Sequence, residues 1–156
     1  MLTIKSENAL KAYNDADKDG KKLLIILLGR KFLAEDVLDR IDSYLDACEE
    51  TGQEPLKLEQ FNFLPEEDRE FHYAIHQMTT IYRAVNKDWK ANYDDGSQPK
   101  WGPWMKKTSS GFVFSLSRFG NASTGTRLGS RLCTSDQKNS DAVGKKFIDI
   151  WNKILS

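Results

Sequence analysis

The most informative absence in this sequence is that of acidic residues over a long stretch. Residues 96–135 contain six Lys or Arg and no Asp or Glu, in a chain of 156 residues that has 23 residues of each sign. The chain is therefore polarised, although its formal net charge is zero. A basic, aromatic-rich stretch is typical of surfaces that meet phosphate backbones, and equally of half-buried sheets.

Cysteines and long apolar runs are also scarce. The two cysteines, Cys48 and Cys133, are too few and too far apart for a disulfide framework, so we expect buried thiols. The longest apolar run, residues 23–28, is far shorter than the about 20 residues of a membrane-spanning helix. The start of the chain lacks the basic-then-apolar pattern of a secretion signal, and we expect an intracellular protein that does not act at a membrane.

The two halves of the sequence differ in the sign of their charge. Residues 1–90 carry 13 basic and 18 acidic side chains, whereas residues 91–156 carry 10 basic and 5 acidic ones. A basic C-terminal half permits an anionic partner. The alternative is that the acidic half packs against the basic half of the same molecule, and the sequence leaves both interpretations open.

Helical patterns fill the N-terminal part of the chain. The apolar spacing and the capping residues predict four helices there, over residues 6–14, 19–29, 36–52 and 65–87. The uninterrupted apolar run in the second predicts a helix that is buried on most sides. The fourth has the longest stripe of apolar residues at spacings of three and four, and is the strongest helix in the sequence.

The C-terminal part reads as a small sheet and a closing helix. Alternating, Phe- and Val-rich residues predict a strand over residues 111–118. We expect a second strand over residues 126–134 and a third over residues 101–106. Ser135 or Asp136 is expected to cap the last helix. We therefore predict one α+β domain, mainly helical over residues 1–88 and, over residues 89–156, an antiparallel sheet packed by the C-terminal helix.

His72 and His76 have a spacing typical of a metal site. They lie one helical turn apart, which can place two imidazoles on one face of a helix. A hydrolytic zinc motif has Glu directly after the first His, where this chain has Tyr73. The nearby cations Arg69 and Arg83 also disfavour a divalent metal, so the two histidines are weak candidates and we expect neither metal nor cofactor.

The basic, aromatic segment supplies the candidate binding residues. For a nucleic acid, the side chains expected on phosphates and bases are those of Lys100, Lys106, Lys107, Arg118, Arg127 and Trp101. Phe112 and Phe114 match part of the aromatic signature of sheets that stack on single-stranded RNA. They lie on one side of a strand, and such a side is more often core.

Three segments, taken in their order along the chain, carry a resemblance to known proteins. They are residues 89–104, which contain Trp89, Trp101 and Trp104, residues 129–133, which read Gly-Ser-Arg-Leu-Cys, and residues 144–149, which read Gly-Lys-Lys-Phe-Ile-Asp. In this order, behind the helix that contains Asp39-Arg40-Ile41, they resemble small uncharacterised proteins encoded by phages and prophages of Bacteroides-like gut bacteria. The resemblance implies a phage-derived protein in the cytoplasm of a bacterial host, or in a virion. It implies no activity and no functional residues.

No catalytic signature accompanies these features. The sequence has no serine elbow, no phosphate-binding loop and no cysteine flanked as in cysteine proteases. We therefore expect a non-enzymatic phage or prophage accessory protein that binds a host or phage protein. The alternatives are a nucleic-acid-binding protein that uses residues 96–135, and a minor virion component.

Overall fold

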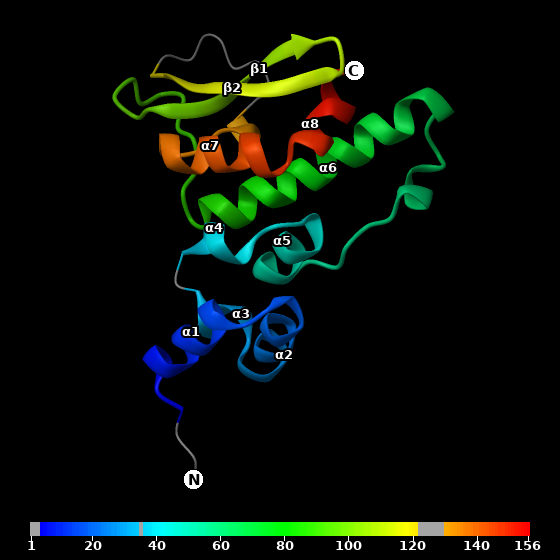
Figure 1. Ribbon diagram of the computed structural model, residues 1–156. Helices are drawn as coiled ribbons and strands as arrows, with labels where there is room; N and C mark the ends of the chain where they lie inside the picture. Colours follow the sequence, from blue (N-terminus) through cyan, green and yellow to red (C-terminus); the bar gives the residue numbers. More distant parts are fainter. Residues whose placement is uncertain (1–3, 35, 122–129) are drawn as a thin grey trace. The chain divides into compact units, whose positions relative to one another are not determined.

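The computed structural model describes residues 4–34, 36–121 and 130–156. The chain forms two compact units, residues 1–40 and 41–156, where the sequence predicted one domain. Helices occupy both ends of the chain, and the longer unit contains a two-stranded antiparallel sheet. The predicted α+β class is confirmed (Figure 1).

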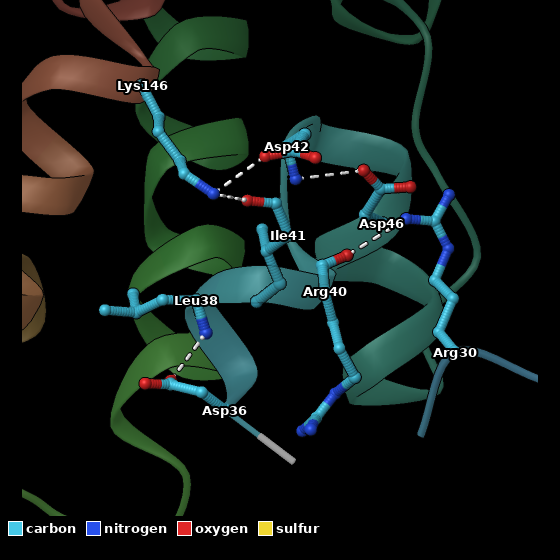
Figure 2. Close-up of polar contacts among 8 residues, drawn as sticks. All are labelled: Arg30, Asp36, Leu38, Arg40, Ile41, Asp42, Asp46 and Lys146. Atoms are coloured by element: carbon cyan, nitrogen blue, oxygen red, sulfur yellow. Dashed lines mark hydrogen bonds and ion pairs between the residues drawn. The ribbon is translucent and has the colours of Figure 1, made fainter. Parts of the chain in front are cut away.

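The first unit consists of short helices. Its elements are α1 (Ser6–Asp15), α2 (Lys18–Leu28), α3 (Arg30–Leu33) and α4 (Val37–Arg40). Asp17 begins α2, because its carboxylate accepts a hydrogen bond of 2.8 Å from the Gly20 amide. The Arg30 guanidinium donates to the carbonyl oxygen of Arg40 over 3.0 Å and so links α3 to the end of α4 (Figure 2).

The predicted burial of the second helix is wrong. No residue of α2 is buried, and Leu23, Ile26 and Leu27 are 56%, 80% and 67% exposed. Six consecutive apolar residues cover every side of a helix, but the short helices of this unit can cover only part of that circumference.

The second unit is layered. Its elements are α5 (Tyr44–Thr51), the 3-10 turn η1 (Leu58–Phe61), α6 (Glu66–Asn86), β1 (Lys100–Thr108), β2 (Gly111–Gly120), the 3-10 turn η2 (Ser130–Leu132), α7 (Gln137–Lys146) and α8 (Ile148–Leu155). The β1–β2 hairpin lies outermost and α7 and α8 lie beneath it. Beneath these lies α6, with α5 on its far side (Figure 1).

The core of this unit is organised by α6. Ala74, Met78, Ile81, Tyr82 and Val85 recur at spacings of three and four and are at most 3% exposed. They pack against α5 on one side and α8 on the other, where the ring of Tyr82 meets Trp151 edge-on at 6.5 Å. The predicted helix over residues 65–87 is thereby confirmed, with its bounds shifted by one residue at each end.

Two other predicted helices are interrupted. The prediction over residues 36–52 is wrong between Arg40 and Tyr44, because Ser43 caps a new helix and accepts a hydrogen bond from the Asp46 amide over 3.2 Å. A serine oxygen that satisfies backbone donors competes with continued helix. The C-terminal helix begins at Asp136 as predicted, but breaks at Phe147 into α7 and α8.

A bulge sets the two faces of the hairpin. Trp104 pairs with Leu116, whereas Met105 pairs with Phe114, so Ser115 is an extra residue on β2. Side chains alternate along a strand, and an extra residue shifts the alternation beyond it. Phe112, Phe114 and Ser117 can therefore share the inner face, and Leu116 is turned to the outer one.

Helix α7 covers the inner face at very short range. The Ser117 hydroxyl donates to that of Ser140 over 2.8 Å in a buried contact. A side chain at Gly144 would collide with the ring of Phe114 and lie 2.9 Å from the Cβ of Pro103. The absence of a side chain at this position therefore allows the helix and the hairpin to pack.

The strand predictions are partly confirmed. β1 and β2 contain the predicted strands over residues 101–106 and 111–118. Of the strand predicted over residues 126–134, residues 126–129 lie outside the described part, and residues 130–132 form η2 instead of a strand. Only Thr134 makes a bridge, exchanging two backbone hydrogen bonds of 2.9 Å with Trp101.

Replacing Gly144 tests this packing. We expect Gly144→Ala to lower the free energy of unfolding by about 1–2 kcal/mol, because the overpacking outweighs the better helix propensity of alanine. Urea unfolding, followed by tryptophan fluorescence, measures the effect. The control is Gly102→Ala, since no atom lies within 4 Å of a side chain built there. An equal stability of the two variants would contradict the account.

Candidate functional site

The hairpin presents an outer face turned away from the helices, which we define by Trp104, Lys106, Val113, Leu116 and Arg118. The strand register places Trp104 opposite Leu116 and Lys106 opposite Val113, so the five side chains share one side of the sheet. Val113 and Leu116 are 41% and 40% exposed, and both cations are exposed. The helices lie on the other side (Figure 1).

The outer face has an apolar centre with a cation toward each end. The Arg118 guanidinium lies 4.7 Å from the centre of the Trp104 ring, a cation–π contact across the strands. Leu116 and Val113 follow along the hairpin, and Lys106 lies opposite Val113. Neither strand nor the turn between them contains an acidic residue. The face is thus a half-apolar, positively charged surface.

Lys100, predicted to contact phosphate, lies elsewhere. It is only 7% exposed, and its ammonium group donates to the carbonyl oxygens of Asp95 at 2.9 Å and Asn121 at 3.4 Å. It also lies 5.4 Å from the centre of the Tyr93 ring. Its charge is used to hold the loop before β1 against the end of β2.

The other predicted contacts are dispersed. Lys107 is exposed near the hairpin turn, with its ammonium group 4.6 Å from the centre of the Phe112 ring. Trp101 is half-buried and its ring packs on that of Phe119 at 4.8 Å. Arg127 lies outside the described residues. Of the five predicted residues that the structure describes, it brings Lys106 and Arg118 together on the outer face.

Phe112 and Phe114 are turned toward the helices. Phe114 lies against Gly144 of α7, and the strand register places Phe112 on the same side of the hairpin as Phe114. The backbone of Phe112 also exchanges hydrogen bonds of 2.7 and 2.9 Å with the Asn152 side chain of α8. These rings therefore belong to the packed side of the sheet. The stacking surface suggested by their motif is not formed.

Two groups near Lys100 have shifted pKa values. The pKa of Asp95 is lowered, chiefly because its carboxylate accepts hydrogen bonds from the hydroxyl and amide of Ser97, at 2.6 and 2.8 Å. Burial raises the pKa of Cys133, whose sulfur lies 3.9 Å from the Tyr93 hydroxyl. The Cys133 thiol is buried as predicted, and it contacts Tyr93 in the loop that precedes β1.

The two histidines have separate surroundings. The His76 ring nitrogen lies 3.2 Å from the Tyr44 hydroxyl, and burial together with the charge of Arg83 lowers the pKa of His76. Burial also raises the pKa of Tyr44 to about 12. His72 instead contacts the ring of Phe71. Within the described ranges, no three His, Cys, Asp or Glu residues are grouped so that they could hold a metal ion.

Sequence reasoning missed Trp104, Val113 and Leu116 as surface residues. Strict alternation places Leu116 on the same side as Phe112 and Phe114, and only the bulge at Ser115 turns it outward. The short polar Ser115 next to an apolar residue is the one local signal, and it does not distinguish a bulge from a regular strand.

Comparisons with family models, curated proteins and solved structures give no match to this chain. The phage origin inferred from the resemblance therefore stays a prediction. In the part of the chain that the structure describes, no helix combines the length and the apolar character needed to cross a bilayer.

Removing the Lys100 side chain tests its structural role. We expect Lys100→Ala to lower the free energy of unfolding by about 1–3 kcal/mol, because two partly buried carbonyl groups lose their donor. Lys106→Ala and Lys107→Ala are the matched controls and should stay within about 0.5 kcal/mol of the parent. Urea unfolding of the three variants measures the difference. A Lys100→Ala variant as stable as the controls would contradict the role.

Proposed function

We propose that this protein is a non-enzymatic interaction factor that docks an acidic, partly apolar segment of a protein partner on the outer face. The observation that carries the proposal is the exposed apolar centre of that face between two cations. The setting is the one that the resemblance predicts, a phage or prophage product in the cytoplasm of a bacterial host. The partner is a host or phage protein.

The composition of the outer face supports a protein partner. Singly exposed aliphatic residues are ordinary on a protein surface, but here Val113, Leu116 and Trp104 are neighbours on paired strands. Covering such an apolar centre with a partner lowers the free energy, and the surrounding charges determine which partner binds. Lys106 and Arg118 favour a segment that carries Asp or Glu beside its apolar side chains.

A nucleic acid is less suited to this face. Single-stranded nucleic acids bind where aromatic rings are free to stack on bases and cations line a groove. Phe112 and Phe114 face the helices, the Arg118 guanidinium lies over the Trp104 ring, and Lys100 is buried. Half-exposed aliphatic side chains contribute little to base stacking, whereas they are common in protein interfaces.

Peptide display tests the proposal through the chemistry of the segments that bind. A library of random peptides is selected against the protein and, in parallel, against the double variant Lys106→Glu/Arg118→Glu. We expect the protein to select peptides rich in Asp and Glu beside apolar residues, and the variant to select Lys and Arg in their place, because the charges around the apolar centre are inverted. Sequencing of the two selected pools measures this shift.

The control is Lys11→Glu/Lys18→Glu, which makes the same change of charge on exposed residues of the first unit. It should select the same peptides as the parent protein. Identical selections by the protein and the outer-face variant would overturn the proposal. The proposal would also be overturned if the protein bound single- or double-stranded oligonucleotides, and if this binding were lost in the outer-face variant but kept in the control.

A further inference from the structure

A cleft of about 500 Å³ lies at the C-terminal end of α6. Its walls come from the last two turns of α6, from the segment that follows and from η2, which is distant in sequence. The Asn86 side-chain amide donates to the carbonyl oxygen of Cys133 over 2.7 Å and so ties the chain just after η2 to α6. The cleft is thus held open by a defined contact between separate segments.

Four cations converge on this cleft. Arg83, Lys87, Lys90 and Arg131 all line it, and all four are exposed. Among the described residues, no acidic one lines the cleft, and none of the four cations takes part in a recorded ion pair. Like charges brought together repel one another, so such a cluster favours the binding of an anion.

The helix dipole explains only part of this cluster. Cations near a helix C-terminus are stabilised by its partial negative charge, which accounts for Arg83 and Lys87. The effect falls off within the last turn, whereas Lys90 lies beyond the helix and Arg131 comes from η2. Their convergence with the first two therefore needs a separate reason, and a bound anion supplies one.

The backbone of Lys87 is strained at this site. It is the only residue other than glycine with a positive φ among those described, at 52°. A side chain in this conformation costs free energy that glycine would not. Strained backbone conformations cluster at functional sites, and Lys87 is one of the residues that line the cleft.

The cleft also has features that suit a flat, polar ring. Trp89 is half-buried and lines the cleft, and an indole can stack on an aromatic ring. Tyr82 and Asn86 line the cleft too, and the Tyr82 hydroxyl and the Asn86 side-chain oxygen are buried with no hydrogen-bond partner recorded in the described structure. Buried polar atoms without partners are uncommon.

We propose that this cleft binds a nucleotide. Its phosphate groups lie among Arg83, Lys87, Lys90 and Arg131, and its base lies against Trp89. Charge-assisted hydrogen bonds from arginine and lysine are the usual means of holding phosphate. A free mononucleotide and the phosphorylated end of a nucleic acid strand present the same groups, and the experiment below distinguishes these two sources.

Calorimetric titration of the full chain at low salt tests the proposal, with adenosine, AMP, ATP and tripolyphosphate as probes. We expect ATP to bind roughly tenfold more tightly than AMP, and adenosine to show no binding, because the phosphates provide most of the attraction. Tripolyphosphate should bind more weakly than ATP, since it lacks the ring. No heat with any phosphate, or equal binding of adenosine and ATP, would overturn the proposal.

Two cleft variants and two control variants assign the binding to the cleft. Arg83→Gln/Lys87→Gln should weaken ATP binding by roughly tenfold or more, and Trp89→Leu should remove the advantage of ATP over tripolyphosphate. Lys11→Gln/Lys18→Gln makes the same change of net charge in the first unit and should bind as the parent does. The outer-face variant Lys106→Glu/Arg118→Glu should also bind ATP normally. Equal weakening in all of them would overturn the assignment.

Lys87→Gly separates binding from folding. We expect this variant to unfold at a higher urea concentration than the parent, because glycine adopts the positive φ without strain. The same variant should bind ATP several-fold more weakly, because one phosphate contact is lost. A variant that is more stable and binds ATP as tightly as the parent would contradict the role of the lysine side chain.

Short oligonucleotides then identify the source of the nucleotide. Hexathymidine with and without a 5′-phosphate is titrated beside thymidine monophosphate. Tighter binding of the phosphorylated strand than of the mononucleotide assigns the cleft to strand ends, and equal binding assigns it to free nucleotides. Both results depend on the proposed cleft, whereas strands that bind equally with and without the phosphate would contradict it.

Discussion

The burial of one face of α6 is the constraint on which the longer unit depends. Met78, Ile81 and Tyr82 are at most 1% exposed, and helices before and after α6 in the sequence pack on them. The same helix leaves the core at its C-terminal end, where the turn after Asn86 starts the long loop toward β1. The position of α6 therefore determines both where the hairpin is carried and where the cleft opens.

The two positively charged surfaces of this unit differ in chemistry. The outer face of the hairpin is open and contains aliphatic side chains. The cleft is concave, and Trp89 lines it together with Tyr82 and Asn86, which each have a buried polar atom. A flat, half-apolar surface matches a folded or extended protein segment, and a small polar hollow matches a compact anion. The two surfaces also come from different parts of the sequence, since Arg83, Lys87 and Lys90 precede the basic segment that forms the hairpin.

The sequence predicts local structure here better than it predicts surfaces. The stripe on α6 and the Asp136 cap were readable because helix periodicity and capping are local. Leu116 and Lys100 were not, since the bulge and the burial of an ammonium group depend on distant packing. The cleft residues gave a weak signal, with Arg83, Lys87 and Lys90 at spacings of four and three. Only the fold brings Arg131 beside them.

The Asn152 side chain limits the addition of strands from other molecules to the edge of β2. Its side-chain amide accepts from and donates to the backbone of Phe112, in the manner of one residue of a neighbouring strand. The open margin of β2 is thereby closed at this point, and an incoming strand would have to displace it. An unpaired sheet edge can add strands from other molecules and so lead to aggregation. Here one amide side chain occupies part of that edge, while the outer face of the hairpin stays exposed.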